Sequence, residues 1–302
     1  MKSQFITPVV SVFDRNGRPD PEQNHRLYDH LVKGGVSGMA VLGSTGEFFS
    51  MDMQTSKTFI DIASGYASDS FRVFAGTSRM DPEESIALAN YAIDKGASGV
   101  MIISPYYVRL SPDAIFDYYA TIARNVSGKI YLYNFPDRTG YSISPSTVLK
   151  LATEFKNIVG LKDTTFDMNH TCDVIKTVKP ELPEFEIFSG FDNNFAHNVL
   201  SGGNGCIGAL SNLAPEIFAS WISAIDAEDF KQVADYQRIV DRMMAIYGIG
   251  DPFIPIVKKA LVLRGVIGSD ACTKPLRLAD AVQSEKVRVL MDAVGLAPVP
   301  VS

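Results

Sequence analysis

Short apolar runs alternate with segments of helical periodicity along the first two thirds of the chain, and this alternation restricts the fold more than any other feature. The runs are rich in β-branched and aliphatic residues and end at Gly, Ser, Thr or Asn, as is typical of buried parallel strands. Most of them end about 30 residues apart, the length of one βα unit. The eight expected strands are Phe5–Val10, Gly38–Leu42, Arg72–Ala75, Gly99–Ile103, Ile130–Tyr133, Ile158–Lys162, Glu186–Phe188 and Cys206–Ala209.

Eight such strands favour closure into a (β/α)8 TIM barrel of the α/β class, although an open doubly wound sheet would show a similar alternation. The helix starts are well marked, because Asp81 and Ser111 are capping residues that each precede a first-turn proline. After Ala209 the pattern contains helices only, and no linker or charge run precedes them. We therefore expect residues 1–214 to form the barrel and residues 215–302 to supply its eighth helix and a packed helical extension, not an independent domain.

Composition indicates a globular protein whose partner is a small molecule. Hydrophobic residues make up 46% and charged residues 21% of the 302 residues, which provides enough apolar material for a sizeable core. The net charge of −6 disfavours binding to nucleic acid and to anionic membrane surfaces. Since no apolar run has the length of a secretory signal or a transmembrane helix, we expect a cytoplasmic location.

Neither a metal site nor a disulfide framework is indicated by the sequence. Cys172, Cys206 and Cys272 lie far apart and form no C-x-x-C pair, which fits a reduced compartment. The histidines have no metal-ligand spacing with one another or with carboxylates. They are His25, His30, His170 and His197. A metal-dependent mechanism is therefore not expected.

Lys162 ends an otherwise apolar strand, on the side of a (β/α)8 barrel where active sites lie. Its stem should be enclosed, and its amine should face the barrel mouth. Burial disfavours the ammonium form of lysine, and a neutral amine attacks a carbonyl carbon to form an imine. The alternative is a structural ion pair with Asp163, and this strand alone supports the two interpretations about equally.

The ends of other strands favour the nucleophile. Tyr133 ends the preceding strand and suits a general acid and base, while Arg138 in the following loop offers a forked donor for a carboxylate. The turn Gly43-Ser44-Thr45-Gly46-Glu47 exposes two hydroxyls and backbone N–H groups that also suit a carboxylate, and a proton relay to Tyr133. Core packing of Tyr133, a solvated Arg138 and rim packing of Tyr106 and Tyr107 are the alternatives.

Several short segments are weak signals alone and specific in combination. They are Gly43-Ser44-Thr45-Gly46-Glu47, Pro105-Tyr106-Tyr107, Tyr133-Asn134-Phe135-Pro136, Thr139-Gly140, Gly160-Leu161-Lys162-Asp163-Thr164, Gly190-Phe191-Asp192, Gly202-Gly203-Asn204-Gly205-Cys206-Ile207-Gly208 and Asp251-Pro252-Phe253-Ile254-Pro255-Ile256-Val257-Lys258. In this order they resemble the dihydrodipicolinate synthase and N-acetylneuraminate lyase family of class I Schiff-base aldolases. The resemblance extends over essentially the whole chain.

The resemblance implies a (β/α)8 barrel with a C-terminal helical extension, assembled as a homotetramer (a dimer of dimers), that acts on pyruvate or a pyruvate-releasing acid without a cofactor. It implies Lys162 as the Schiff-base former, Tyr133 as the proton shuttle, and Tyr107 as a relay residue that reaches into the adjoining subunit's site. The residues that it implies for carboxylate binding, proton relay or backbone contact with substrate are Ser44, Thr45 and Ile207.

The expected substrate is a 2-keto-3-deoxy sugar acid or a related hydroxylated 2-oxo acid, cleaved to pyruvate and an aldehyde. The segment Gly190-Phe191-Asp192-Asn193 resembles the sugar-acid lyases, with Asp192 and Asn193 suited to hydroxyl recognition beside Gly190. Arg138 instead resembles the synthases that condense pyruvate with aspartate semialdehyde, the main alternative; a functional Arg138 would indicate a second carboxylate on the cleaved acid. A hydro-lyase that uses the same imine and a non-catalytic barrel that binds a small acid are the remaining alternatives.

Overall fold

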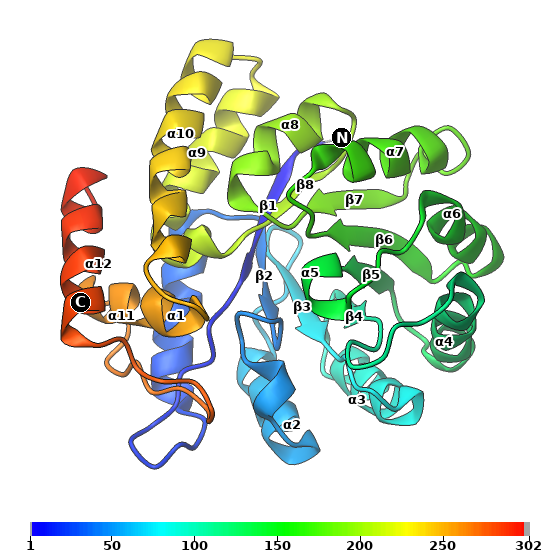
Figure 1. Ribbon diagram of the computed structural model, residues 1–302, viewed down its shortest axis with the longest axis horizontal. Coiled ribbons are helices and arrows are strands. Elements are labelled where there is room, and N and C mark those ends of the chain that lie inside the picture. Colours follow the sequence, from blue (N-terminus) through cyan, green and yellow to red (C-terminus); the bar gives the residue numbers. More distant parts are fainter. Residues whose placement is uncertain (1, 299–302) are drawn as a thin grey trace.

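Eight parallel strands close into a barrel in the computed structural model, which describes residues 2–298, and this confirms the predicted (β/α)8 fold (Figure 1). The strands pair in chain order, and the last returns to pair with the first. Each expected strand forms, with ends within two residues of those expected. The strands are β1 Gln4–Pro8, β2 Gly38–Val41, β3 Arg72–Gly76, β4 Gly99–Ile103, β5 Ile130–Asn134, β6 Ile158–Asp163, β7 Glu186–Ser189 and β8 Gly205–Ile207.

Helices cover the outside of the barrel between successive strands, and further helices follow at one side of it, next to α1 and α9 (Figure 1). The surrounding helices are α1 Pro21–Gly34, α2 Met53–Ala63, α3 Pro82–Asp94, α4 Pro112–Asn125, α6 Pro145–Glu154, α7 Met168–Val178, α8 Phe195–Leu200 and α9 Pro215–Asp226. The later helices are α10 Phe230–Met243, α11 Ile254–Leu263 and α12 Ala281–Ala293. Short helical turns are α5 Pro136–Thr139, η1 Phe48–Ser50, η2 Asp192–Asn194, η3 Ala209–Asn212 and η4 Met244–Gly248.

The helix starts follow the capping residues seen in the sequence. The Asp81 carboxylate accepts a hydrogen bond from the Glu83 backbone N–H at 2.9 Å, and the Ser111 hydroxyl accepts one from Ala114 at 3.2 Å. Each cap satisfies one of the N–H groups that the first helical turn leaves without a partner. Within residues 2–298, no helix combines the length and the apolar character that are needed to cross a membrane.

The barrel interior is a packed apolar layer rather than a pore. It separates the two ends of the barrel, and a second, larger core lies between the sheet and the helices. The inner layer consists of Ile6, Ala40, Phe74, Met101, Tyr131, Phe188 and Ile207. Side chains above this layer therefore face the C-terminal mouth, and side chains below it face the N-terminal end.

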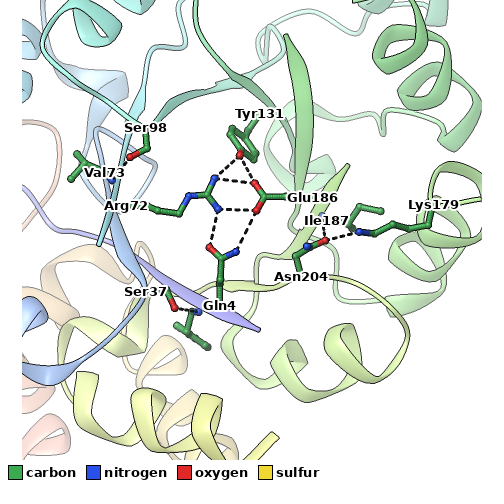
Figure 2. Close-up of polar contacts among 11 residues, drawn as sticks. Gln4, Ser37, Arg72, Val73, Ser98, Tyr131, Lys179, Glu186, Ile187 and Asn204 are labelled. Atoms are coloured by element: carbon green, nitrogen blue, oxygen red, sulfur yellow. Dashed lines mark hydrogen bonds and ion pairs between the residues drawn. The ribbon is translucent and has the colours of Figure 1, made fainter. Parts of the chain in front are cut away.

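A polar cluster closes the N-terminal end of the barrel (Figure 2). Arg72 holds both oxygens of Glu186, at 2.8 and 2.9 Å, and donates to the Gln4 side chain at 2.8 Å; the Tyr131 hydroxyl also donates to Glu186. Burial raises the pKa of the Glu186 carboxyl, but the Arg72 guanidinium outweighs this effect and keeps the pKa below its ordinary value. The charges are thus paired, and the open end of the barrel is the C-terminal one.

Candidate functional site

A cavity of about 380 Å³ lies at the C-terminal ends of the strands, which is where (β/α)8 barrels carry their chemistry. It brings together most of the residues that the sequence singled out. Those in its lining are Ser44, Thr45, Tyr133, Arg138, Lys162, Gly190 and Ile207. They come from β2, β5, β6, β7 and β8 or from the loops directly after these strands.

Lys162 and Tyr133 form the centre of the cavity. They are direct neighbours in the pairing of β5 with β6, and each side chain is only 4% exposed. The Lys162 Nζ lies 4.4 Å from the centre of the Tyr133 ring. A lysine amine and a phenol are therefore held side by side in a nearly water-free setting, the arrangement required for imine formation with an adjacent proton donor and acceptor.

Asp163 points away from the cavity because successive side chains on a strand alternate between the two faces of the sheet. Its carboxylate accepts hydrogen bonds from the Asn134 amide at 2.7 Å and the Thr171 hydroxyl at 2.6 Å, and it pairs with His170 Nδ1 at 2.9 Å. Burial lowers the pKa of His170, but its bond to Asp163 outweighs this, so the pKa is raised overall. No ion pair joins Lys162 to Asp163 in the described part of the chain, so the Lys162 amine stays available.

The loop after β2 brings two hydroxyls to the same mouth. The Ser44 Oγ lies 3.4 Å from the Tyr133 hydroxyl, and Thr45 is buried beside it. The loop is bounded by Leu42 and Glu47, two non-glycine residues with left-handed φ angles of 57° and 63°. Such angles are uncommon for these residues and persist where the surroundings enforce them.

Gly46 allows this loop to lie close to its neighbours. A Cβ atom at Gly46 would lie 3.1 Å from both the Leu42 nitrogen and the Val9 carbonyl oxygen. The Gly46 carbonyl in turn accepts a hydrogen bond of 2.7 Å from the Ser11 hydroxyl. The small residues of the turn are thus needed for its close packing as well as for access to the cavity.

Arg138 lies at the rim of the cavity on α5, where its guanidinium stacks over the Phe135 ring at 5.6 Å. It has no ion-pair partner among residues 2–298, so its donors remain available to an anion that enters the mouth. Just after the lysine strand, Phe166 is 75% exposed and stacks on Phe191, with ring centres 4.3 Å apart. The outer part of the cavity is therefore lined by aromatic rings and one arginine.

Three residues singled out in the sequence lie outside the cavity lining. Asp192 is buried behind it and accepts hydrogen bonds from the Tyr247 hydroxyl at 2.7 Å and the Leu210 backbone at 2.9 Å. Asn193 lies beside it, and its carbonyl accepts a bond from a glutamine of α10. Tyr107 is 89% exposed, in the loop after β4.

The sequence analysis gave no role in the site to several lining residues, among them Phe166, Met244, Tyr247 and Phe253. Phe166 follows the lysine strand by only a few residues, so its place after a strand end was a usable signal. The other three belong to η4 and the segment before α11. Their position at the cavity mouth depends on how the C-terminal helices pack against the barrel, and no local sequence pattern predicts that packing.

Asp192 should make the stability of the protein depend on pH. Burial raises the pKa of its carboxyl from 3.8 to about 6. Because the folded state binds this proton more tightly than the unfolded state, the free energy of unfolding should fall as the pH rises from about 4 to about 6. Asp192→Asn keeps one oxygen acceptor for the Leu210 backbone N–H, and its amide NH2 can donate to the Tyr247 oxygen. This variant should remove the fall, worth about 2 to 3 kcal/mol.

Urea unfolding at several pH values measures this effect. The stability of Asp192→Asn relative to the wild type should rise between about pH 4 and pH 7, whereas the exposed Asp113→Asn should give no such trend. Parallel pH curves for the wild type and Asp192→Asn would show that Asp192 does not titrate in this range.

Comparison with known proteins identifies the family. The model of the dihydrodipicolinate synthetase family matches residues 1–294. The chain is 35% identical to a probable 2-dehydro-3-deoxy-D-pentonate aldolase, YjhH, of Escherichia coli K12, over 98% of this chain and 99% of that protein. It is 33% identical to a 4-hydroxy-tetrahydrodipicolinate synthase of Kosmotoga olearia, over 95% of this chain and 97% of the other.

A solved structure gives the same result. The crystal structure of YagE from Escherichia coli K12, in complex with pyruvate, superposes with a TM-score of 0.94 at 31% identity and covers 98% of this chain and 99% of YagE. YagE is described as a member of the dihydrodipicolinic acid synthase family. The expected enzyme class, a lyase of the aldolase type, is thereby confirmed at the level of the family. The chain therefore belongs to the dihydrodipicolinate synthetase family, as the order of its sequence motifs predicted.

Proposed function

We propose that this protein is a cofactor-free aldolase that cleaves a 2-keto-3-deoxy sugar acid, or a related hydroxylated 2-oxo acid, into pyruvate and an aldehyde. The observation that carries the proposal is the buried contact of Lys162 with Tyr133 at the closed base of the cavity. The similarity to YjhH, whose name is that of a pentonate aldolase, and to YagE, whose structure contains pyruvate, supports it.

The reaction begins when the Lys162 amine attacks the C2 carbonyl of the substrate and water leaves, which forms an imine. The protonated imine withdraws electrons as the C3–C4 bond breaks, while the Tyr133 oxygen accepts the proton of the C4 hydroxyl and passes its own proton to the Ser44 hydroxyl of the relay. The aldehyde leaves, and the enamine at C3 takes up a proton. Water then hydrolyses the imine, which releases pyruvate and restores the lysine.

The substrate carboxylate binds the loop after β2 in this proposal. Ser44 and Thr45 supply hydroxyls, and the turn supplies backbone N–H groups. The distance of 3.4 Å between Ser44 and the Tyr133 hydroxyl supports a proton relay between the loop and the phenol. Gly190 and Ile207 also line the cavity, and in this proposal they lie against the pyruvate unit, Ile207 through its backbone.

The residues outside the lining have indirect roles in this proposal. Asp192 fixes the Tyr247 hydroxyl, and Asn193 continues the turn that presents Asp192. Tyr107 completes the relay in the site of an adjoining copy, and its exposure in the single chain supports this role. The protein would then act as a homotetramer, a dimer of dimers, in which each site borrows one tyrosine.

A synthase that condenses pyruvate with aspartate semialdehyde is the second candidate. The observation that favours it is Arg138 at the rim, which has no ion-pair partner in the described part of the chain and would bind the carboxylate of the aldehyde. The similarity to the Kosmotoga olearia synthase also supports it. Under the aldolase proposal, Arg138 selects sugar acids with an anionic or strongly polar far end.

A coupled assay of the purified protein separates the two candidates. We expect pyruvate release from at least one member of a panel of 2-keto-3-deoxy pentonates and hexonates, and little condensation of pyruvate with aspartate semialdehyde. Lys162→Met, assayed in parallel, corrects for contaminating enzymes. Strong condensation without pyruvate release from any sugar acid would replace the aldolase proposal with the synthase.

A further inference from the structure

A fully buried ion pair joins the loop after β2 to the C-terminal helices. Lys258 on α11 contacts the carboxylate of Glu47, and the exposed fraction of both side chains is 0%. The Lys258 ammonium also donates to the Ala271 carbonyl at 2.7 Å and lies 4.8 Å from the centre of the Phe13 ring. The pair lies outside the cavity lining, so contact with substrate does not account for it.

The second oxygen of Glu47 is also held by the C-terminal part of the chain. The backbone N–H and the hydroxyl of Thr273 each donate to it at 2.7 Å. The described partners of the Glu47 side chain therefore come from α11 and the segment that follows it, not from the barrel. A buried carboxylate requires partners of this kind, because an ionised group without them is strongly destabilised.

Glu47 is well placed to control the two hydroxyls of the cavity. It follows Thr45 by two residues and has a left-handed φ of 63°, at the end of the turn that begins at Leu42. The turn has few bonds of its own, from the Gly46 N–H to the Gly43 carbonyl at 3.0 Å and from the Glu47 N–H to the Ser44 carbonyl at 3.2 Å. An uncommon backbone angle at its last residue needs an outside restraint, and the buried ion pair supplies one.

We propose that Glu47, Lys258 and Thr273 are positioning residues: the C-terminal helices hold Ser44 and Thr45 in the orientation that binds the substrate carboxylate. The inference rests on the proposed function, which assigns the carboxylate to this loop. The extension thereby contributes to pyruvate binding from outside the cavity. Catalytic sites lose activity when a binding group moves by as little as about 1 Å, so a small relaxation of the turn has a large effect.

The test measures pyruvate binding separately from turnover. Full-length protein is incubated with increasing pyruvate and borohydride, and intact-mass analysis gives the half-saturating concentration for the adduct on Lys162. We expect Lys258→Met to raise this concentration about tenfold or more and Thr273→Val to raise it several-fold. The amount of adduct at saturation should stay at one per chain, a result that partial unfolding would not give.

Lys259→Met is the matched control. It removes the ion pair of Lys259 with Asp270, one position along the same helix and partly exposed, and should leave the half-saturating pyruvate concentration unchanged. If Lys258→Met does not fold, Glu47→Gln combined with Lys258→Met leaves no unpaired charge and should still bind pyruvate more weakly than the wild type. Circular dichroism of each variant establishes that it is folded.

The outcomes distinguish this inference from the proposed function. Wild-type affinity for pyruvate in both Thr273→Val and the folded variants of Lys258 would overturn the positioning role and leave the aldolase proposal intact. Absence of any adduct on the folded wild-type protein would overturn the proposed function, and this inference with it. A raised half-saturating concentration with full adduct at saturation supports both.

Discussion

Replacement of Lys162 with methionine should abolish the borohydride-trapped pyruvate adduct and reduce turnover by about 10⁴-fold or more, as is typical when a covalent nucleophile is removed. Methionine has nearly the same length and suits a buried site, so the barrel should fold normally. In the wild type, intact-mass analysis should find one pyruvate-derived adduct per chain, and peptide mapping should place it on Lys162.

A lysine elsewhere on the same βα unit is the control for this experiment. Lys176 on α7 is largely exposed, and Lys176→Met should form the adduct and turn over like the wild type. An adduct on a different lysine, or substantial turnover by Lys162→Met, would move the nucleophile away from β6. Full turnover without any trapped adduct would exclude an imine mechanism altogether.

Tyr133→Phe should separate imine formation from bond cleavage. The lost hydroxyl lies near Ser44 and is proposed to accept the C4 hydroxyl proton, so we expect the adduct to form while turnover falls by roughly 10²-fold to 10⁴-fold. The ring remains, and with it the stacking on Phe135 and the contact with the Lys162 amine. Rapid-quench measurement of the adduct alongside steady-state pyruvate release distinguishes the two steps.

Tyr91→Phe provides the comparison, because this tyrosine on α3 bonds to Asp61 far from the barrel mouth. It should leave both steps unchanged. Near-normal turnover by Tyr133→Phe would assign the proton transfer to another group, and Ser44 would be the first candidate. Loss of the adduct together with turnover would mean that the phenol is already required for imine formation.

The barrel and the core of the site could be predicted from the sequence because both depend on local patterns. A strand that is buried on both faces is a continuous apolar run, so a charged or polar residue at its end stands out, as Lys162 and Tyr133 do. Parallel strands then place such ends at one mouth. The pairing of Tyr133 with Lys162 follows from this geometry, which the sequence pattern already contained.

The remaining features depend on contacts between distant parts of the chain. Lys258 lies next to Lys259 on a helix whose other residues are apolar, and nothing near it in sequence indicates that its partner is Glu47. Asp192 was expected in the cavity from its neighbours in the motif, whereas the turn directs its carboxylate to Tyr247. The partners of these two side chains are determined by tertiary packing, which hydrophobic periodicity does not predict.

The closed N-terminal end of the barrel determines the order of events in the proposed reaction. Arg72 and Glu186 seal one end, and the apolar layer above them leaves no passage through the centre. Under the proposed mechanism, substrate and products therefore enter and leave through the C-terminal mouth, and the pyruvate unit would lie at Lys162, deeper in the cavity than the aldehyde. The aldehyde would then have to leave the cavity before the imine is hydrolysed, so the order of product release would be aldehyde first and pyruvate second.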